Sequence, residues 1–435
     1  MPKPQIIAGV DIGSSKIVTI IASSVSDSEE EKVRVIGVAN TPSKGIRKGQ
    51  IVNIEETTTS LLECVEAAER MAGYNISRAL VAISGPHIAS SNSRGVVAVA
   101  EPEAEINKDD IKRVIEAAQA LSLPASREII HVIPRYFTVD GQEGIKDPAG
   151  MSGIRLEVET HIITGSSTAI KNLTRSVSEI GVDTQSLVVS GLAAAESVLT
   201  ETEKELGVVL VDIGGGVTDI MIYIEGSPFY TSVLPIGAKN VTNDLAIGLR
   251  LSLESAEKIK IALSTKKEKE KEDEDDQEGE EKAKNADEID LTDLGITEEA
   301  KTISRKTLVE GIIKPRLNEI FTMIGLEIKK SGASGLTPSG VVLCGGGAQT
   351  VGVIDSAKRI LAMPVRVGQP NGLTGLVDDI QTSEYAVATG LVLYKAKEAT
   401  ETSLFHLGRL GKSLQKIPGK GVAGKFVDLI KSFLP

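Results

Sequence analysis

The sequence predicts an α/β fold in which two related halves face each other across a cleft. Four apolar residues, Val208–Val211, indicate a buried strand, and Asp-Ile-Gly-Gly-Gly follows at 212–216, where glycine lets the backbone turn. Some two hundred residues earlier, positions 6–16 read Ile-Ile-Ala-Gly-Val-Asp-Ile-Gly-Ser-Ser-Lys, which is again an apolar strand ending in Asp-Ile-Gly. One strand-and-turn device that occurs twice at this separation suggests a duplicated, two-lobed architecture.

These turns also indicate the chemistry of the cleft. Glycine-rich turns offer backbone N–H groups to an anion, and Asp11 and Asp212 suit a hydrated divalent ion such as Mg²⁺, which takes carboxylate and water oxygens alongside phosphates. A third glycine turn, residues 345–347, follows the strand Val341–Cys344. Bare backbone there lets a flat ring lie close, so this turn fits the base and ribose of a nucleotide.

Composition narrows the class of protein. At 435 residues the chain exceeds one ordinary core, so two or more domains are expected. A formal charge of −12, no tryptophan and only 3% aromatic residues argue against a nucleic-acid partner. Cys64 and Cys344 are too few for a disulfide framework and are expected to be buried thiols. The N-terminus does not read as a signal peptide and no window is apolar enough to span a bilayer, so we expect a cytoplasmic protein.

Much of the negative charge is local. Residues 266–290 hold thirteen acids and six lysines, a composition that cannot form a core. We therefore predict a solvated, disordered insertion over 266–290.

Periodicity places the remaining elements. In the first half it predicts, in order, a strand at 33–38, a helix at 55–73, a strand at 79–83, a helix at 109–120, strands near 128–139 and 155–164, a helix at 168–180, a strand at 184–189 and a connecting helix at 191–199. In the second half it predicts helices at 237–250, 253–263 and 297–330, with Pro315 at a break, and a small-residue connecting helix at 385–394. The breaker cluster at 84–86 marks a domain edge.

The three glycine turns, in this order, resemble the actin, Hsp70 and sugar-kinase ATPase superfamily, and nearly the whole chain resembles the FtsA family of bacterial cell-division proteins. The closer resemblance is carried by the runs 131–134 and 150–153, by an insertion at 85–162 and by an amphipathic tail. It implies an actin-like two-lobed ATPase fold. Its parts would be subdomain 1A (1–84 and 163–195), 1C (85–162), 2A (196–240 and 340–396), 2B (241–339), a flexible linker (397–420) and a membrane-targeting helix (421–435).

The resemblance also assigns nucleotide-site residues for ATP and Mg²⁺. Asp11 and Asp212 would organise Mg²⁺ through water, while Glu257 and Lys260, one turn apart on a helix, would grip the ribose. The remaining candidates are Gly13, Ser14, Ser15, Lys16, Gly214, Gly215, Gly216, Thr218, Gly237, Gly345, Gly346, Gly347 and Ala348.

One position departs from the family pattern. Where that pattern has a hydroxyl residue near the γ-phosphate, this chain has Val217, and Thr218 comes one position later. Successive strand residues point to opposite faces, so Thr218 cannot simply substitute. We therefore expect ATP binding with weak or no hydrolysis, and no catalytic residue is assigned.

The resemblance implies several partners. Subdomain 2B would bind the C-terminal peptide of the tubulin-like division protein FtsZ through Arg316 and Glu319 in the run 314–319, with Arg305 as a second candidate. Other implied partners are further copies of the chain in a filament, later division proteins and the anionic inner face of the cell membrane at the septum.

The membrane contact is assigned to the tail. On a helical wheel of residues 421–434 the apolar side chains gather on one arc and the polar ones on the other, and fourteen residues suit the interface of a bilayer rather than its span. The membrane-binding candidates are Val422, Lys425, Phe426, Leu429, Ile430, Phe433 and Leu434.

Two alternative functions stay open at this point. A chaperone or sugar-kinase ATPase would need a substrate domain that 85–162 does not obviously supply. An actin-like pilus-assembly ATPase would lack the membrane-binding tail.

Overall fold

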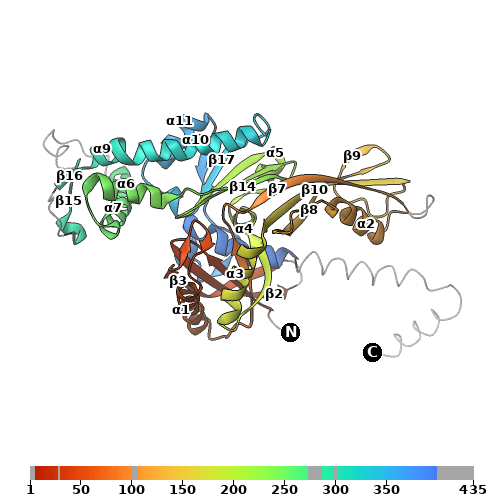
Figure 1. Ribbon diagram of the computed structural model, residues 1–435, viewed down its shortest axis with the longest axis horizontal. Helices are drawn as coiled ribbons and strands as arrows, with labels where there is room; N and C mark the ends of the chain where they lie inside the picture. The colour runs from red at the N-terminus through yellow and green to blue at the C-terminus, as the bar shows by residue number, and fades with distance from the viewer. Residues whose placement is uncertain (1–4, 28–29, 100–104, 273–286, 297–301, 399–435) are drawn as a thin grey trace, which may run out of the picture.

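A computed structural model describes residues 5–27, 30–99, 105–272, 287–296 and 302–398. Two sheets, one of six strands and one of nine, form its framework. In Figure 1 the helices α6, α7 and α9 gather at one end, α2 and β9 lie at the other, and α1, α3 and β3 form the lower lobe. The tail candidates at 421–435 lie outside the described residues, as does almost all of the predicted linker.

The first half is a six-stranded sheet in the order β11-β6-β1-β2-β3-β19. Its strands are β1 (Gln5–Ile12), β2 (Lys16–Asp27), β3 (Glu30–Pro42), β6 (Arg78–Ile83), β11 (Asp183–Val189) and β19 (Thr374–Gly375). Helices α1 (Ile54–Ala72), α3 (Ser167–Glu179) and α4 (Ser190–Val198) accompany it. α1 forms where it was predicted because Asn53 accepts a hydrogen bond from the backbone N–H of Glu56 and Gly73 ends the helix with a left-handed φ of 65°.

A nine-stranded sheet joins the second half to the segment 85–164, in the order β18-β17-β12-β13-β14-β7-β10-β8-β9. The first five are β18 (Val365–Val367), β17 (Val341–Cys344), β12 (Val208–Ile213), β13 (Thr218–Ile224) and β14 (Ser227–Leu234). The others are β7 (Ala89–Ala98), β10 (Arg155–Ser166), β8 (Arg127–Val139) and β9 (Gln142–Ile145), with α2 (Lys108–Gln119) packed on β7 and β10. Ser232 of β14 pairs with Ala89 of β7, so the inserted segment extends the sheet of the second half rather than that of the half in which it lies in sequence.

The outer part of the second half corrects two predictions. Helix α7 (Leu253–Glu272) continues past the predicted end at 263, and β15 (Glu288–Asp290) buries Ile289 to 3% exposure, so a helix and a strand extend into the two ends of the segment 266–290. The predicted helix over 297–330 begins only at Arg305, because β16 (Thr302–Ser304) pairs with β15. The charged residues around 288–290 gave no sign of this strand, although Ile289 within it is buried.

A wide turn breaks the long helix near the predicted position. α9 (Arg305–Leu308) passes through the π-helical turn η2 (Val309–Ile313) into α10 (Lys314–Lys330), where Pro315 occupies the first turn. Proline has no N–H to donate to the preceding helical turn, and it lies just after the π-helical turn, where the α-helical hydrogen-bond pattern is already interrupted. The remaining elements are α5 (Glu201–Leu206), α6 (Ala238–Leu249), η1 (Thr292–Leu294), η3 (Gly346–Gln349), α11 (Val353–Leu361), η4 (Asp378–Ile380), η5 (Ser383–Tyr385) and the short hairpin β4 (Ile46–Arg47) with β5 (Gln50–Ile51).

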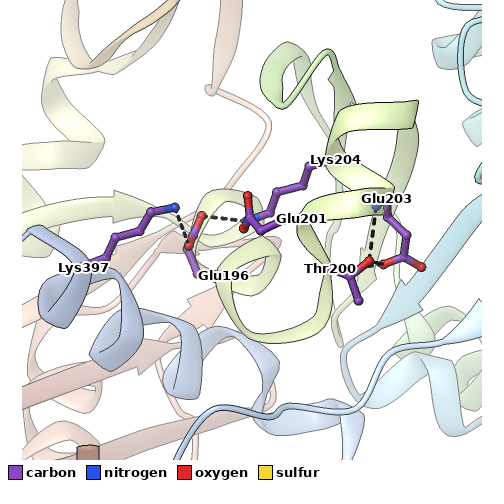
Figure 2. Close-up of polar contacts among 6 residues, drawn as sticks. All are labelled: Glu196, Thr200, Glu201, Glu203, Lys204 and Lys397. Atoms are coloured by element: carbon purple, nitrogen blue, oxygen red, sulfur yellow. Dashed lines mark hydrogen bonds and ion pairs between the residues drawn. The ribbon is translucent and has the colours of Figure 1, made fainter. Parts of the chain in front are cut away.

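Two helices connect the halves, as predicted. α4 and the helix at 386–398 pack without space for a side chain between them, since a Cβ on Gly390 would lie 1.8 Å from the carbonyl oxygen of Ala193. A polar cluster joins the end of α4, helix α5 and the end of the 386–398 helix (Figure 2). Lys204 Nζ of α5, 3% exposed, lies 3.1 Å from Glu196 and 3.0 Å from Glu201. Lys397 lies 3.3 Å from Glu196. The junction between the halves is therefore both tightly packed and held by charges.

The two thiols are buried, as expected, and three of the histidines are held by hydrogen bonds within the fold. Cys64 and Cys344 are buried and form no disulfide. His161 is fully buried between Asn92 and Thr231, His131 accepts a hydrogen bond from the backbone of Val189 and His87 accepts one from the backbone of Ser166. Within the described ranges, no helix has the length and apolar character needed to cross a membrane.

Candidate functional site

The two Asp-Ile-Gly turns close in the same way. In the β1–β2 turn the N–H of Gly13 donates to the carbonyl of Lys16 over 3.1 Å, and in the β12–β13 turn the N–H of Gly214 donates to the carbonyl of Val217 over 2.9 Å. Because both turns close with the same backbone hydrogen bond, the repeat seen in the sequence is also a repeat in three dimensions.

The turns face each other with almost no space between them. A Cβ on Gly215 would lie 2.0 Å from Ser15 Oγ, and one on Gly216 would lie 2.8 Å from Ser14 Oγ. Ser14 Oγ in turn accepts a hydrogen bond from the N–H of Gly49, which brings the β4–β5 hairpin against the first turn. The two halves thus meet through glycine backbone and serine hydroxyls.

A cavity of about 800 Å³ opens between the halves, within the range that suits a small-molecule ligand. Most of the predicted nucleotide-site residues line it: Asp11, Gly13, Ser14, Ser15, Lys16, Asp212, Gly214, Gly215, Gly216, Glu257, Lys260, Gly345, Gly346 and Gly347. Residues from three distant parts of the chain therefore converge as the sequence suggested.

Three predicted site residues do not line the cavity. Thr218 is fully buried and its hydroxyl donates to the carbonyl of Ile236, so it faces away, whereas Val217 lines the wall. Gly237 packs behind the second turn, because a Cβ there would lie 2.5 Å from the carbonyl oxygen of Gly214. Ala348 is buried in the core of the second half. These three predicted residues therefore lie outside the cavity lining, and strand alternation accounts for Thr218.

Carboxylates gather at the bottom of the cavity. Burial raises the pKa of Asp11 to about 6, and burial together with the neighbouring Asp11 raises that of Asp212 to about 7. Burial and Asp212 also raise the pKa of Asp219 well above its usual range, although Ser84 Oγ lies 2.7 Å from both of its oxygens. A divalent cation at this point would stabilise the ionised form of these carboxyls and lower their pKa values again.

Helix α7 forms one wall through the predicted Glu257 and Lys260. Lys260 Nζ lies 2.7 Å from Glu257 Oε2 and 3.0 Å from the hydroxyl of Thr242, which also donates to Glu257. The pair is therefore held in position by α6 and lines the cavity.

The third glycine turn lies directly beside Asp212. Gly345 has a φ of 80°, and a Cβ there would come within 2.1 Å of Asp212 Oδ1; a Cβ on Gly347 would come within 2.3 Å of the Ile213 side chain. Glycine at both positions lets this turn lie against the second one.

Sequence reasoning missed one cation, Lys239, and one ion pair, that of Lys16 with Glu384, both of which cross the cleft. Lys239 Nζ, from the first turn of α6, donates to the carbonyl of Ser14 over 2.6 Å, and burial lowers the pKa of this lysine. Lys16 was predicted to hold phosphate, but its partner Glu384, 2.8 Å away on η5, was not foreseen. Neither contact has a local signal, since each joins residues more than two hundred positions apart.

The predicted partner-binding residues lie on α9 and α10. Arg316 makes a bidentate contact with Asp244 (2.5 and 2.9 Å) and also pairs with Glu319, so its guanidinium is already well compensated. Arg305 donates through Nη2 to the carbonyl of Leu263 over 2.9 Å, while its Nη1 is buried without a hydrogen-bond partner among the described residues.

The fold and the paired turns place the chain in the actin-like class. Among solved structures it resembles the PilM–PilN type IV pilus biogenesis complex (TM-score 0.59, 16% identity, 89% of this chain and 98% of that one) and MreB5 of Spiroplasma citri bound to AMPPNP (TM-score 0.51, 14% identity, 94% and 100%). At these identities the likeness concerns the fold alone.

Sequence comparisons identify the family. A profile described as the SHS2 domain inserted in FTSA matches residues 85–164, and one for cell division protein FtsA matches 209–390. The chain is 38% identical over 397 residues to cell division protein FtsA of Pseudomonas aeruginosa (91% of both chains) and 38% identical over 416 residues to that of Borreliella burgdorferi (96% of this chain, 97% of the relative). The Bacillus subtilis protein is 37% identical over 399 residues (92% and 85%). The chain belongs to the FtsA family of cell division proteins.

Proposed function

We propose that this cell-division protein binds ATP with Mg²⁺ between its two halves and uses the bound state to organise filaments that join the FtsZ ring to the membrane. The observation that carries the proposal is the 800 Å³ cavity in which both Asp-Ile-Gly turns, the Glu257–Lys260 pair and the third glycine turn converge. Family membership supports the division role, and the AMPPNP-bound MreB5 neighbour has the same general fold.

The residues present fit a hydrated metal ion. Asp11 and Asp212 both line the cavity, and Mg²⁺ is commonly bound through one or two carboxylates together with water and phosphate oxygens. Asp11 and Asp212 would hold its water ligands, and the ion would neutralise phosphate charge.

The other groups have distinct parts in this proposal. The backbone of 214–216 and the hydroxyls of Ser14 and Ser15 would bind phosphates, with Lys16 as the nearby cation. Glu257 and Lys260 would bind the ribose hydroxyls, and the 345–347 turn would lie against the base.

Slow hydrolysis follows from the wall near the phosphates. Val217 supplies no hydroxyl to orient an attacking water, and Thr218 points into the core. We therefore propose a nucleotide-stabilised assembly state rather than a rapid ATPase cycle. Phosphate release near the rate of buffer alone, with ATP bound, is the expected result; turnover of several per second would contradict it.

For the FtsZ peptide, the geometry favours Arg305 over the initially preferred Arg316. Arg316 is engaged by two carboxylates, those of Asp244 and Glu319, whereas Arg305 donates to a backbone carbonyl, that of Leu263, and has no carboxylate partner among the described residues. Arg305→Glu should weaken binding of the FtsZ C-terminal peptide about tenfold or more, since charge-assisted hydrogen bonds contribute roughly 1.5–3 kcal/mol. Arg316→Ala is the matched comparison. Equal affinities in wild type and Arg305→Glu would count against this site.

Membrane attachment is proposed for residues 421–435, outside the described structure. Phe433→Glu would put a charge within the apolar arc and should abolish co-sedimentation with anionic vesicles while nucleotide binding persists. Failure of the wild-type protein to bind such vesicles, even with ATP, would refute the tether. Recruitment of later division proteins would follow from this localisation.

A further inference from the structure

The lysines that line the nucleotide cavity differ in what already neutralises them. Lys16 Nζ lies 2.8 Å from a carboxylate oxygen of Glu384. Lys260 Nζ lies 2.7 Å from a carboxylate oxygen of Glu257. Lys239 Nζ instead donates to a neutral backbone carbonyl, and it forms no salt bridge with the described residues. In the described part of the cavity wall, Lys239 is therefore the lysine that has no carboxylate partner.

Lys16 is held by two neighbours on η5. Besides its ion pair with Glu384, its ammonium lies 4.1 Å from the centre of the Tyr385 ring. A phosphate would have to compete with a carboxylate for Lys16, whereas at Lys239 it would compete only with a carbonyl. Since hydrogen bonds between two charged groups are the stronger kind, the exchange costs less at Lys239.

Lys239 lies where the two Asp-Ile-Gly turns meet. It is the second residue of α6, and the first two N–H groups of this helix donate over 2.9 Å to the carbonyls of Gly214 and Gly215. These bonds fasten the helix to the second turn. The Lys239 side chain then crosses to the first turn, where Nζ lies 2.6 Å from the carbonyl oxygen of Ser14. A phosphate chain held by both turns would therefore pass beside this ammonium.

The ammonium of Lys239 is open to a ligand. Its side chain is exposed and forms part of the cavity lining. The desolvation that it does experience lowers its pKa, while the charges of Glu257 and Lys260 act on that pKa in opposite directions. The ion pair on α7 thus does not neutralise Lys239, but an anion in the cavity would.

We propose that Lys239 is a second phosphate-binding cation of the nucleotide site and that it favours nucleotides over the nucleoside. This role deepens the proposed function and rests on it. An ammonium has three N–H donors, so Nζ can keep its bond to the carbonyl of Ser14 and still donate to a phosphate oxygen. Lys239 would then join the two halves more firmly when phosphate is present than when it is absent.

The test is a calorimetric titration of the full chain with ATP and Mg²⁺ and, by displacement, with adenosine, which lacks phosphate. In Lys239→Met the Kd for ATP should rise about tenfold or more while the Kd for adenosine stays within about twofold, because only ATP loses a charge-assisted hydrogen bond. Lys239→Arg keeps the charge and should recover most of the ATP affinity.

Lys44→Met is the matched control. It removes one positive charge from the loop beside the first turn, where the N–H of Ser43 donates to the carbonyl of Ser15. The Lys44 side chain is exposed and is not part of the cavity lining. Both Kd values should therefore stay close to those of the wild type.

The outcomes separate this role from the proposed function. A wild-type protein that binds no ATP overturns the proposed function. Where the wild type binds ATP, a Lys239→Met protein that changes both Kd values by the same factor overturns the role of Lys239 alone, because a mere strut between the halves would affect both ligands alike. Lys239→Arg as weak as Lys239→Met also overturns it, and this comparison decides if adenosine binds too weakly to measure. Should Lys239→Met fail to fold, Lys239→Gln takes its place under the same criteria.

Discussion

Gly215 and Ser15, from opposite halves of the molecule, lie so close that a Cβ on Gly215 would be 2.0 Å from the Ser15 hydroxyl oxygen. No side chain fits in that space, so contact between the two turns depends on glycine. The same approach would let both turns bind one phosphate chain at once, which is the geometric basis of the nucleotide proposal.

Gly215→Ala should therefore weaken nucleotide binding by about tenfold or more, which corresponds to about 1.4 kcal/mol, because the halves must separate to admit the methyl group. Gly311→Ala is the control, since a Cβ at Gly311 meets nothing within 4 Å. Calorimetric titration of both variants checks this. Equal affinities in the two would mean that the observed approach of the turns does not matter for the ligand.

The cluster in Figure 2 predicts a stability difference between two glutamates that share one lysine. Lys204 is 3% exposed, Glu196 is 15% exposed and Glu201 is 80% exposed. Glu196→Gln should lower the free energy of unfolding by about 3 kcal/mol, because it leaves a buried ammonium with only a solvated partner. Glu201→Gln should cost less than about 1 kcal/mol, as exposed ion pairs do. Denaturant unfolding curves compare them, and a larger loss in Glu201→Gln would overturn this reading.

His161 predicts a pH dependence with a definite sign. Burial, and to a lesser extent the charge of Arg135, lower its pKa from 6.5 to about 3, so the unfolded chain binds this proton more readily than the folded one. The stability associated with neutral His161 is present above pH 6.5 and is lost as the pH falls toward 3. Between pH 7 and 5 this histidine should cost about 2 kcal/mol.

The measurement is the free energy of unfolding of wild type and His161→Gln at several pH values. The difference between the two should shift in favour of the variant as the pH is lowered from 7 to 5. A difference independent of pH would show that His161 titrates alike in both states.

The central site could be predicted from sequence because its signals are local. Asp11 and Asp212 each end an apolar strand at a glycine turn, and that combination implies the same hairpin twice. The α1 helix was equally predictable, since its cap, its apolar face and its terminal glycine all lie within one segment.

What sequence reasoning missed depends on pairing between distant segments. The contact of Ser232 with Ala89, which joins the inserted segment to the second half, has no local signature, and neither has the reach of Lys239 to Ser14. The strand at 288–290 was hidden because its neighbours are charged, although Ile289 enters the core. Thr218 was counted among the site residues on its type, whereas the strand's alternation turns it into the core.

The most direct test of the central claim is calorimetric titration of ATP and Mg²⁺ into wild type and Asp212→Asn. The amide keeps the shape of the side chain at the bottom of the cavity and removes the charge that a hydrated metal ion would need. We expect saturable binding to the wild type and an affinity about ten- to a hundredfold lower in the variant, in line with the roughly 1.5–3 kcal/mol of a charged partner. An unchanged affinity in a folded Asp212→Asn protein would contradict the assignment of the cleft between the two halves as the nucleotide site.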